Sequence, residues 1–345
     1  MRQSNFELLR ILAMLLVILV HSNFFSINIP THTEIIDNSI VSYSRLFVQG
    51  LSITCVNIFI LISGYFGIKP NLRSFSKFIF SCLFISISVY LFCVILNYDI
   101  FTLSSILDIT FLSKEFWFIK SYIFLYILSP LINSFISTVI KKQYELVIIA
   151  LTVYMVVFSW IFDSTEYLEG GASPLFFIYL YLLGRYLKIY SVNLFSRNYI
   201  YIFIYFLISL ILASISFVSL KYCPQFGCAR MFRYDNPLVV FQAIALLLFF
   251  KNWSFQSSFV NYVATSSLAI YLLHTHPSLM SSFFVAPISS AFHNYSYPLF
   301  LLFVFGIALS YVITAIIIDK IGVAIYNNIT KKLDTKNGIK EKCCL

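Results

Sequence analysis

Residues 5–25 read NFELLRILAMLLVILVHSNFF, and this stretch decides the fold class. Residues 8–25 are mostly apolar, and as a helix they are long enough to cross most of a hydrocarbon core about 30 Å thick. A charged start followed by an apolar run also occurs in signal peptides, but no small-x-small cleavage site follows Val20. We therefore expect a first transmembrane helix that is retained in the protein.

The composition extends this expectation to the whole chain. Of its 345 residues, 60% are hydrophobic and 11% are charged, and the mean hydropathy is +0.89; an average soluble domain is about 25% charged. One globular core could not bury so much apolar surface, which excludes an ordinary water-soluble protein. The net charge of +9 is scattered between apolar runs and forms no basic face for nucleic acid. The seven cysteines lack zinc-type spacing, and we expect no metal.

Apolar runs of roughly membrane-spanning length recur along the chain. We expect an all-α, polytopic membrane helical bundle with about ten transmembrane helices. The eighth and ninth runs are the weakest, because one is short and the other ends in polar residues. The runs cover residues 8–25, 46–66, 75–96, 116–136, 146–162, 174–190, 199–220, 237–250, 259–274 and 298–318.

The charges between these runs predict the orientation. With ten helices both termini lie on one side, and basic residues favour the cytoplasmic side of a membrane. We therefore expect both termini to be cytoplasmic, in the plasma (inner) membrane, with a transmembrane domain at 1–320 and a short basic tail at 321–345. The inner segments would hold Arg2, Arg10, Lys69, Arg73, Lys77, Lys141, Lys142, Arg185, Lys188, Arg197, Lys251 and the tail lysines, and the outer segments Glu34, Asp37, Asp99, Asp108, Glu115, Asp163, Glu166, Glu169 and Asp235.

Ionisable residues inside a membrane are costly, so those of the first helix are functional candidates. His21 follows Arg10 by eleven residues, which at 100° per residue places it only about 20° away around the helix and about 16 Å further along. A neutral imidazole facing a shared polar cavity can act as a general base. Two structural alternatives remain: Arg10 can extend its charge to the membrane surface or pair with Glu7, and His21 can cap the helix.

Four stretches resemble the acyltransferase-3 family of integral membrane acyltransferases. Residues 5–13 (NFELLRILA) with His21 resemble its opening Arg-x10-His motif, and residues 56–66 (VNIFILISGYF) resemble its aromatic-rich run. Residues 116–131, with FWFI and then YILSPL, resemble its Trp motif and the continuation, and residues 267–274 (SLAIYLLH) its penultimate-helix signature. The motifs occur in family order over nearly the whole chain. The chain departs from the family after the second helix, where it has only Lys69, Arg73 and Lys77 in place of the paired-Arg stretch that often occurs there.

The resemblance implies a membrane-bound O-acyltransferase. Such enzymes move an acyl group, usually acetyl, from acyl-CoA to a hydroxyl of an envelope polysaccharide or lipid-linked glycan. His21 would be the general base or a transient acyl carrier, with Arg10 and its neighbour Glu7 in the catalytic set. The phosphates of acetyl-CoA, the expected donor, would be held by Arg10 with Lys69, Arg73 and Lys77, because guanidinium groups bind phosphate bidentately.

Several further residues are candidates with structural alternatives. Ser63 and Gly64 either line the donor path or permit close helix packing. Five other residues are candidates for binding the acceptor, but each of them could instead serve helix packing, lie at the membrane interface or extend its charge to the surface. Cys223 and Cys228 are candidates for a disulfide in an outer loop. The acceptor-binding candidates are Asn57, Trp117, Lys120, Tyr271 and His274.

A rival function from another class is a transporter or flippase for lipid-linked sugars. Arg10 and His21 would then line a substrate path, but the chain lacks paired Gly/Pro-broken helices in two matching halves. A glycan polymerase or ligase would need a larger outer loop. The expected partners are acyl-CoA, the glycan acceptor and membrane lipids, with no nucleic acid; the oligomeric state stays open.

Overall fold

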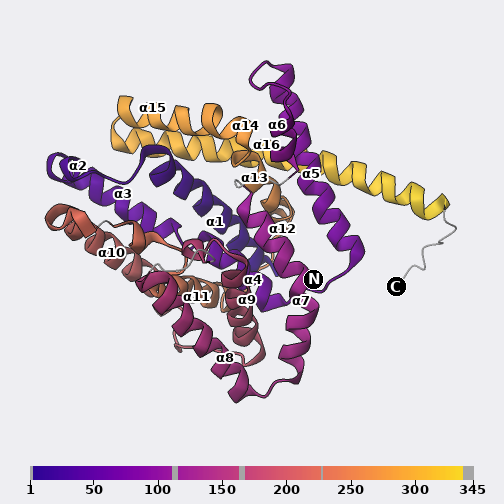
Figure 1. Ribbon diagram of the computed structural model, residues 1–345, viewed down its shortest axis with the longest axis horizontal. Helices are drawn as coiled ribbons and strands as arrows, with labels where there is room; N and C mark the ends of the chain where they lie inside the picture. The colour runs from indigo at the N-terminus through magenta and orange to yellow at the C-terminus, as the bar shows by residue number, and fades with distance from the viewer. Residues whose placement is uncertain (1–2, 111–115, 163–167, 227, 337–345) are drawn as a thin grey trace.

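Helix α4 (Cys55–Phe66) lies inside the molecule and contacts α1 (Ser4–Val20), α9 (Pro174–Ile189) and α11 (Pro237–Lys251). The computed structural model describes residues 3–110, 116–162, 168–226 and 228–336, and this part of the chain contains helices and no strands (Figure 1). The predicted all-α fold is therefore confirmed.

Eight helical segments of the described chain are long and apolar enough to cross a membrane. A multi-pass membrane bundle, as predicted, is the architecture that fits them. The segment with α3 and α4 is 72% buried in its most apolar window, whereas that of α16 is only 17% buried. Lipid must therefore cover much of α16. The eight are Ser4–Phe25, Ser39–Phe66, Leu72–Ile95 (α5), Trp117–Thr138 (α7), Lys141–Ile161, Tyr199–Tyr222 (α10), Ala229–Lys251 and Tyr297–Lys332, which is part of α16 (Tyr297–Lys336).

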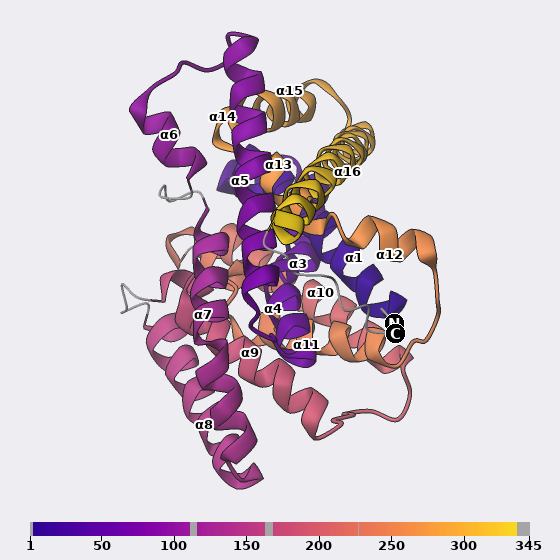
Figure 2. The same ribbon diagram turned by 90° about the vertical axis from the view of Figure 1, so that its right-hand side faces the viewer.

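The sixth and ninth predicted spans form shorter helices. The sixth is α9, whose 16 residues are about 24 Å long and pack against protein on α4, α7 and α8 (Lys141–Tyr154). The ninth is divided into α12 (Ser258–Ala264) and α13 (Ser267–His274). At the break, the buried Ser266 hydroxyl donates to Asp319 Oδ2 of α16 at 2.7 Å. Helix α13 lies between α5 and α16 (Figure 2).

A second packing unit joins α2 (His32–Asp37), α3 (Ser39–Ser52) and α10. Its buried Arg45 pairs with Glu34 at 3.2 Å and donates to the backbone carbonyls of Ile27 and Asn28. The guanidinium also lies 4.8 Å from the ring centre of Phe292, a favourable cation–π geometry. These contacts fix the loop that follows the first helix. The remaining helices are α6 (Leu103–Ile109), α14 (Pro277–Leu279) and α15 (Ala286–Asn294), with short 3₁₀ or π turns between several elements.

The predicted tail begins inside a helix, because α16 continues without interruption through residue 320 to Lys336. Residues 337–345 of that tail, and Arg2, Glu115, Asp163 and Glu166 among the charges used for orientation, lie outside the described residues.

Candidate functional site

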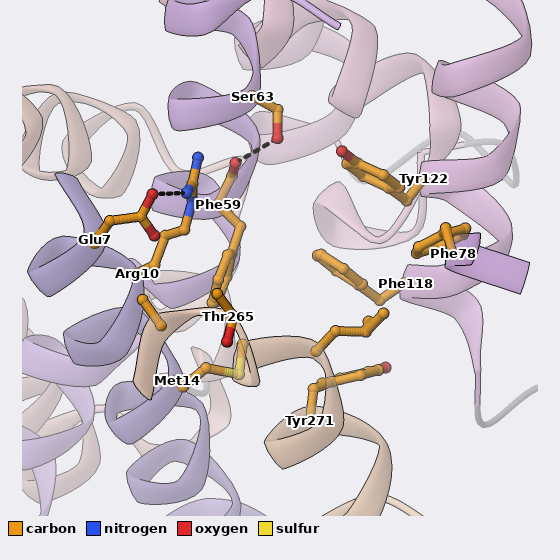
Figure 3. Close-up of a pocket in the computed structure, with 12 residues that line it drawn as sticks. Glu7, Arg10, Met14, Phe59, Ser63, Phe78, Phe118, Tyr122, Thr265 and Tyr271 are labelled. Carbon is orange, nitrogen blue, oxygen red and sulfur yellow. Dashed lines mark hydrogen bonds and ion pairs between the residues drawn. The ribbon is translucent and has the colours of Figure 1, made fainter. Parts of the chain in front are cut away.

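Glu7 and Arg10 lie on one face of α1 and line a cavity of about 310 Å³ (Figure 3). Arg10 Nη1 donates to Glu7 Oε1 at 2.7 Å, as the alternative pairing in the first helix predicted. Glu7 is nearly enclosed, with a side chain 6% exposed, whereas the Arg10 side chain is 31% exposed. The carboxylate therefore orients a guanidinium that keeps other N–H groups available to the cavity.

His21 lines a second cavity of about 220 Å³ further along the same helix. Four residues line both cavities, so the two lie side by side along α1: Met14, Phe59, Phe118 and Tyr271. Helix α1 keeps α-helical geometry from Ser4 to Val20, so the spacing of Arg10 and His21 follows the expected period. The structure thus places both side chains on adjoining cavities at opposite ends of one helix face.

The helix changes geometry at His21, where a π-helical turn, η1 (His21–Phe25), begins. Such turns widen a helix by one residue and occur often at functional sites. Ser26 Oγ donates to the His21 carbonyl oxygen at 2.6 Å, and Ser22 Oγ donates to that of Ile18 at 2.8 Å. These hydroxyls satisfy backbone acceptors around the turn that carries the imidazole.

The His21 imidazole contacts a second imidazole from the other end of the chain. His21 Nδ1 lies 3.0 Å from Nε2 of His274, the last residue of α13. His274 is fully buried, and its Nδ1 lies 2.7 Å from the carbonyl oxygen of Ile270. It lines neither cavity and lies behind His21, so the acceptor-binding role of His274 stays a prediction.

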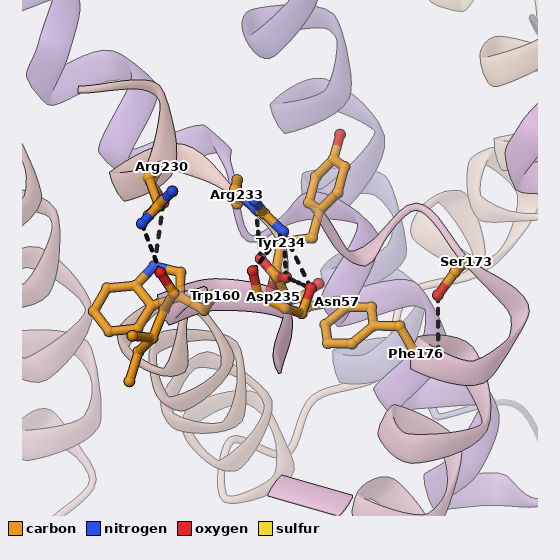
Figure 4. Close-up of polar contacts among 10 residues, drawn as sticks. Asn57, Trp160, Ser173, Phe176, Arg230, Arg233, Tyr234 and Asp235 are labelled. Carbon is orange, nitrogen blue, oxygen red and sulfur yellow. Dashed lines mark hydrogen bonds and ion pairs between the residues drawn. The ribbon is translucent and has the colours of Figure 1, made fainter. Parts of the chain in front are cut away.

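Aromatic rings form much of the wall around His21. Trp117, the first residue of α7, lies with its ring centre 5.9 Å from that of Tyr234, and both line the second cavity. Tyr234 precedes α11, and Asn57 of α4 holds its carbonyl oxygen through a 2.9 Å hydrogen bond (Figure 4). Asn57 lines neither cavity, and its described contact is with the backbone of the wall, so its acceptor-binding role stays a prediction.

Charged residues on either side of Tyr234 fix it further. Arg233 pairs with the buried Asp235 at 2.9 Å and donates to the Ser159 carbonyl at 3.1 Å (Figure 4). The Ser159 hydroxyl donates to the same carboxylate. Because the chain is held on both sides of Tyr234, this ring has a defined place in the cavity wall.

Neutralising Asp235 is expected to loosen this wall. Asp235→Asn removes the charge that Arg233 and Ser159 contact, and should lower the free energy of unfolding by about 1.5–3 kcal/mol, the range for hydrogen bonds to charged groups. Thermal unfolding of the purified protein in detergent measures this. The matched control is Asp37→Asn at an exposed position of α2. Equal melting temperatures for the two variants would contradict the assignment.

The other predicted site residues are of two kinds, those that line a cavity and those that are exposed outside both linings. Ser63 lines the first cavity and Tyr271 lines both, whereas the basic residues after α4 are exposed and outside the cavity linings. Phe78, the residue after Lys77, does line the first cavity, so the basic segment flanks it. Lys120 is exposed and outside both linings, which supports the surface-reaching alternative. The flanking basic residues are Lys69, Arg73 and Lys77.

Gly64 lies where α4 and α9 cross at close range. A Cβ atom at Gly64 would lie 2.3 Å from the Tyr181 carbonyl oxygen, and one at Gly184 would lie 2.3 Å from that of Leu61. These two glycines let α4 and α9 approach with their backbones in contact, and Gly64 lines neither cavity. This geometry supports the packing alternative for Gly64, and the donor-binding role stays a prediction.

The predicted disulfide is absent, because both cysteines carry free thiols. Cys223 is exposed at the end of α10, whereas Cys228 is buried in the unit formed by α2, α3 and α10. Burial raises the pKa of the Cys228 thiol to about 11, which keeps it protonated and unreactive at neutral pH. The two cysteines are only five residues apart in the sequence, but one is exposed and the other is buried.

Several lining residues were not predicted. Met14 and Val17 fall on the face of Arg10 and His21 at intervals of four, three and four residues, so helical periodicity could have found them. Tyr122 and Thr265 at the Arg10 end, and Tyr234 at the His21 end, are brought there by tertiary packing, and no local pattern marks them.

Comparison with known proteins identifies a family for nearly the whole chain. The family model described as an acyltransferase domain, of the acyltransferase-3 type, matches residues 3–319, which include both cavities. None of the curated proteins and none of the solved structures compared with the chain matches it.

Proposed function

Because the chain belongs to the acyltransferase-3 family of integral membrane acyltransferases, we propose that it transfers an acyl group, expected to be acetyl, from acyl-CoA to a hydroxyl of an envelope polysaccharide or lipid-linked glycan. One observation carries the proposal beyond the family: Arg10 and His21 line adjoining cavities along a single helix face. Such an arrangement suits a donor that is charged at one end and reactive at the other.

The Arg10 end suits the phosphates of the donor. Glu7 orients the guanidinium, and Lys69, Arg73 and Lys77 flank the cavity on the segment before Phe78. We place this end at the cytoplasmic face of the plasma membrane, because CoA is a cytoplasmic polyanion and basic residues favour that side. The extended arm of the donor then follows the shared lining towards His21.

The His21 end suits the chemistry. His21 removes the proton from the acceptor hydroxyl as its oxygen attacks the thioester carbonyl. The new C–O bond forms, the C–S bond breaks, and the proton passes from the imidazole to the departing thiolate of CoA. Trp117 and Tyr234 offer ring faces for a sugar, and Tyr271 lies between the donor and acceptor sides.

The proposal is tested by transfer in lipid vesicles. Purified protein is supplied with radiolabelled acetyl-CoA and a total envelope glycolipid extract, and the label in glycolipid is counted. Protein-dependent label supports the acyltransferase. Failure to label any glycolipid, with folded protein and with longer acyl-CoAs also tried, overturns it; protein-dependent movement of glycolipid across the vesicle membrane would then identify a flippase.

Arg10→Ala should separate phosphate binding from chemistry. Loss of a charged hydrogen bond to phosphate should raise the KM for acetyl-CoA about 10- to 100-fold, while transfer from acetyl-pantetheine, which lacks phosphates, stays near the wild-type rate. The KM of Arg10→Lys for acetyl-CoA should lie between those of the wild type and Arg10→Ala, because a lysine keeps the charge without the bidentate geometry. An equal loss with both donors would contradict phosphate binding by Arg10.

A further inference from the structure

The contacts of His274 specify which of its nitrogens carries a proton. Its Nδ1 lies 2.7 Å from the Ile270 carbonyl oxygen, which can only accept, so this nitrogen must be the N–H. His274 is fully buried, and the contacts described for it are a carbonyl, an imidazole and aromatic rings, with no carboxylate to balance a charge. The ring is therefore neutral, and its Nε2 carries a lone pair.

The protonation of His21 follows from that of His274. The lone pair on His274 Nε2 faces His21 Nδ1 at 3.0 Å, so His21 must donate from Nδ1. A neutral His21 then has its own lone pair on Nε2. In the described part of the chain no hydrogen bond to that nitrogen is recorded, and the ring lines the second cavity.

We propose that His274 is a positioning residue, which holds His21 in the Nδ1–H tautomer and leaves the Nε2 lone pair for the acceptor hydroxyl. This inference rests on the proposed function, and it assigns His274 a role other than the one expected from the sequence. One line of hydrogen bonds therefore runs from the Ile270 carbonyl through His274 to His21 and ends at the cavity.

The same line stabilises the charged state formed during transfer. When His21 Nε2 takes the hydroxyl proton, the resulting imidazolium keeps its Nδ1–H bond to the His274 lone pair. The proton leaves again from Nε2 to the thiolate of CoA, so His274 is unchanged at the end of the step. His274 therefore orients the catalytic base, as the third group does in other acyl-transfer sites.

Two substitutions of similar size separate an acceptor from an apolar filler. His274→Gln offers an amide oxygen to His21 Nδ1, whereas His274→Leu offers nothing. We expect His274→Leu to lower kcat about 10²-fold or more, because loss of the correct tautomer is costly in base catalysis, with the KM for acyl-CoA unchanged. His274→Gln should retain most of the wild-type kcat. The control is His276→Leu, which removes a neighbouring buried imidazole that contacts Ser86 and not His21.

A measurement without turnover distinguishes this inference from the proposed function. Solid-state NMR of protein with ¹⁵N-labelled histidine reports which nitrogen of each ring is protonated, and the His21 signals are identified by their loss in His21→Ala. We expect Nδ1–H for His21 in wild type, His274→Gln and His276→Leu, and Nε2–H in His274→Leu. An Nε2–H tautomer in wild type, or equal kcat for the Gln and Leu variants of an active enzyme, overturns the role of His274. Absence of transfer by wild type overturns the function instead.

Discussion

Replacing His21 with alanine is expected to lower kcat for acyl transfer by about 10³-fold, within the range for loss of a general base. The KM for acyl-CoA should stay near the wild-type value, because Arg10, the group assigned to the phosphates, lies about 16 Å away along α1. Steady-state transfer of radiolabelled acetyl groups to glycolipid measures both constants. Among the residues that the structure describes, this change removes the one ionisable side chain other than tyrosine that lines the second cavity.

The control for His21→Ala is His32→Ala. His32 begins α2 and contacts the Leu220 carbonyl oxygen, away from both cavities, so its loss should leave transfer unchanged. Unfolding curves of both variants show whether either change affects the fold. More than a tenth of wild-type activity in folded His21→Ala would mean that another group takes the proton.

The second large effect is expected at the crossing of α4 and α9. Gly64→Leu places a branched side chain where even a Cβ would lie 2.3 Å from a backbone oxygen of Tyr181. The two backbones would have to separate, and α4 also carries Phe59 and Ser63 of the first cavity. We expect more than about 4 kcal/mol of destabilisation, seen as loss of the monodisperse peak in detergent size-exclusion chromatography.

Gly306→Leu is the matched control for the packing prediction. Gly306 is exposed on α16, and a Cβ there meets nothing within 4 Å. The same substitution should therefore be tolerated or slightly stabilising, because glycine is a poor helix former. A folded Gly64→Leu protein with a wild-type melting temperature would show that the helices can separate at little cost.

The parts of the site that follow helical periodicity could be predicted from the sequence. The Arg10 and His21 face depends only on 100° per residue along one helix, and the structure keeps that geometry. The pairing of His21 with His274 could not be predicted, because 253 residues separate them and each lies in an apolar run that fits many neighbours. Tyr234 was missed for the same reason: contacts from Asn57, and from Arg233 and Asp235 beside it, put it in place.

Two predicted spans form shorter helices in the structure, and both of them pack against protein. Length and hydropathy identify segments that match the thickness of a bilayer. Helix α9 does not have to match that thickness, because it packs on α4, α7 and α8. The break in the ninth run could not be predicted from local sequence. The two groups that meet there, the Ser266 hydroxyl and the Asp319 carboxylate, lie 53 residues apart. Gly64 kept two interpretations because a helix-packing glycine and a cavity-lining glycine look alike in a sequence.

Helix α16 has 40 residues and is about 60 Å long, twice the thickness of a hydrocarbon core. At the tilts usual for transmembrane helices, up to about 40°, it still rises about 45 Å along the membrane normal, so part of it must stand outside the hydrocarbon core. A helical partner protein fused in register after Lys336 would continue this helix without a flexible joint. Such a fusion would provide a rigid landmark for particle alignment in electron cryomicroscopy.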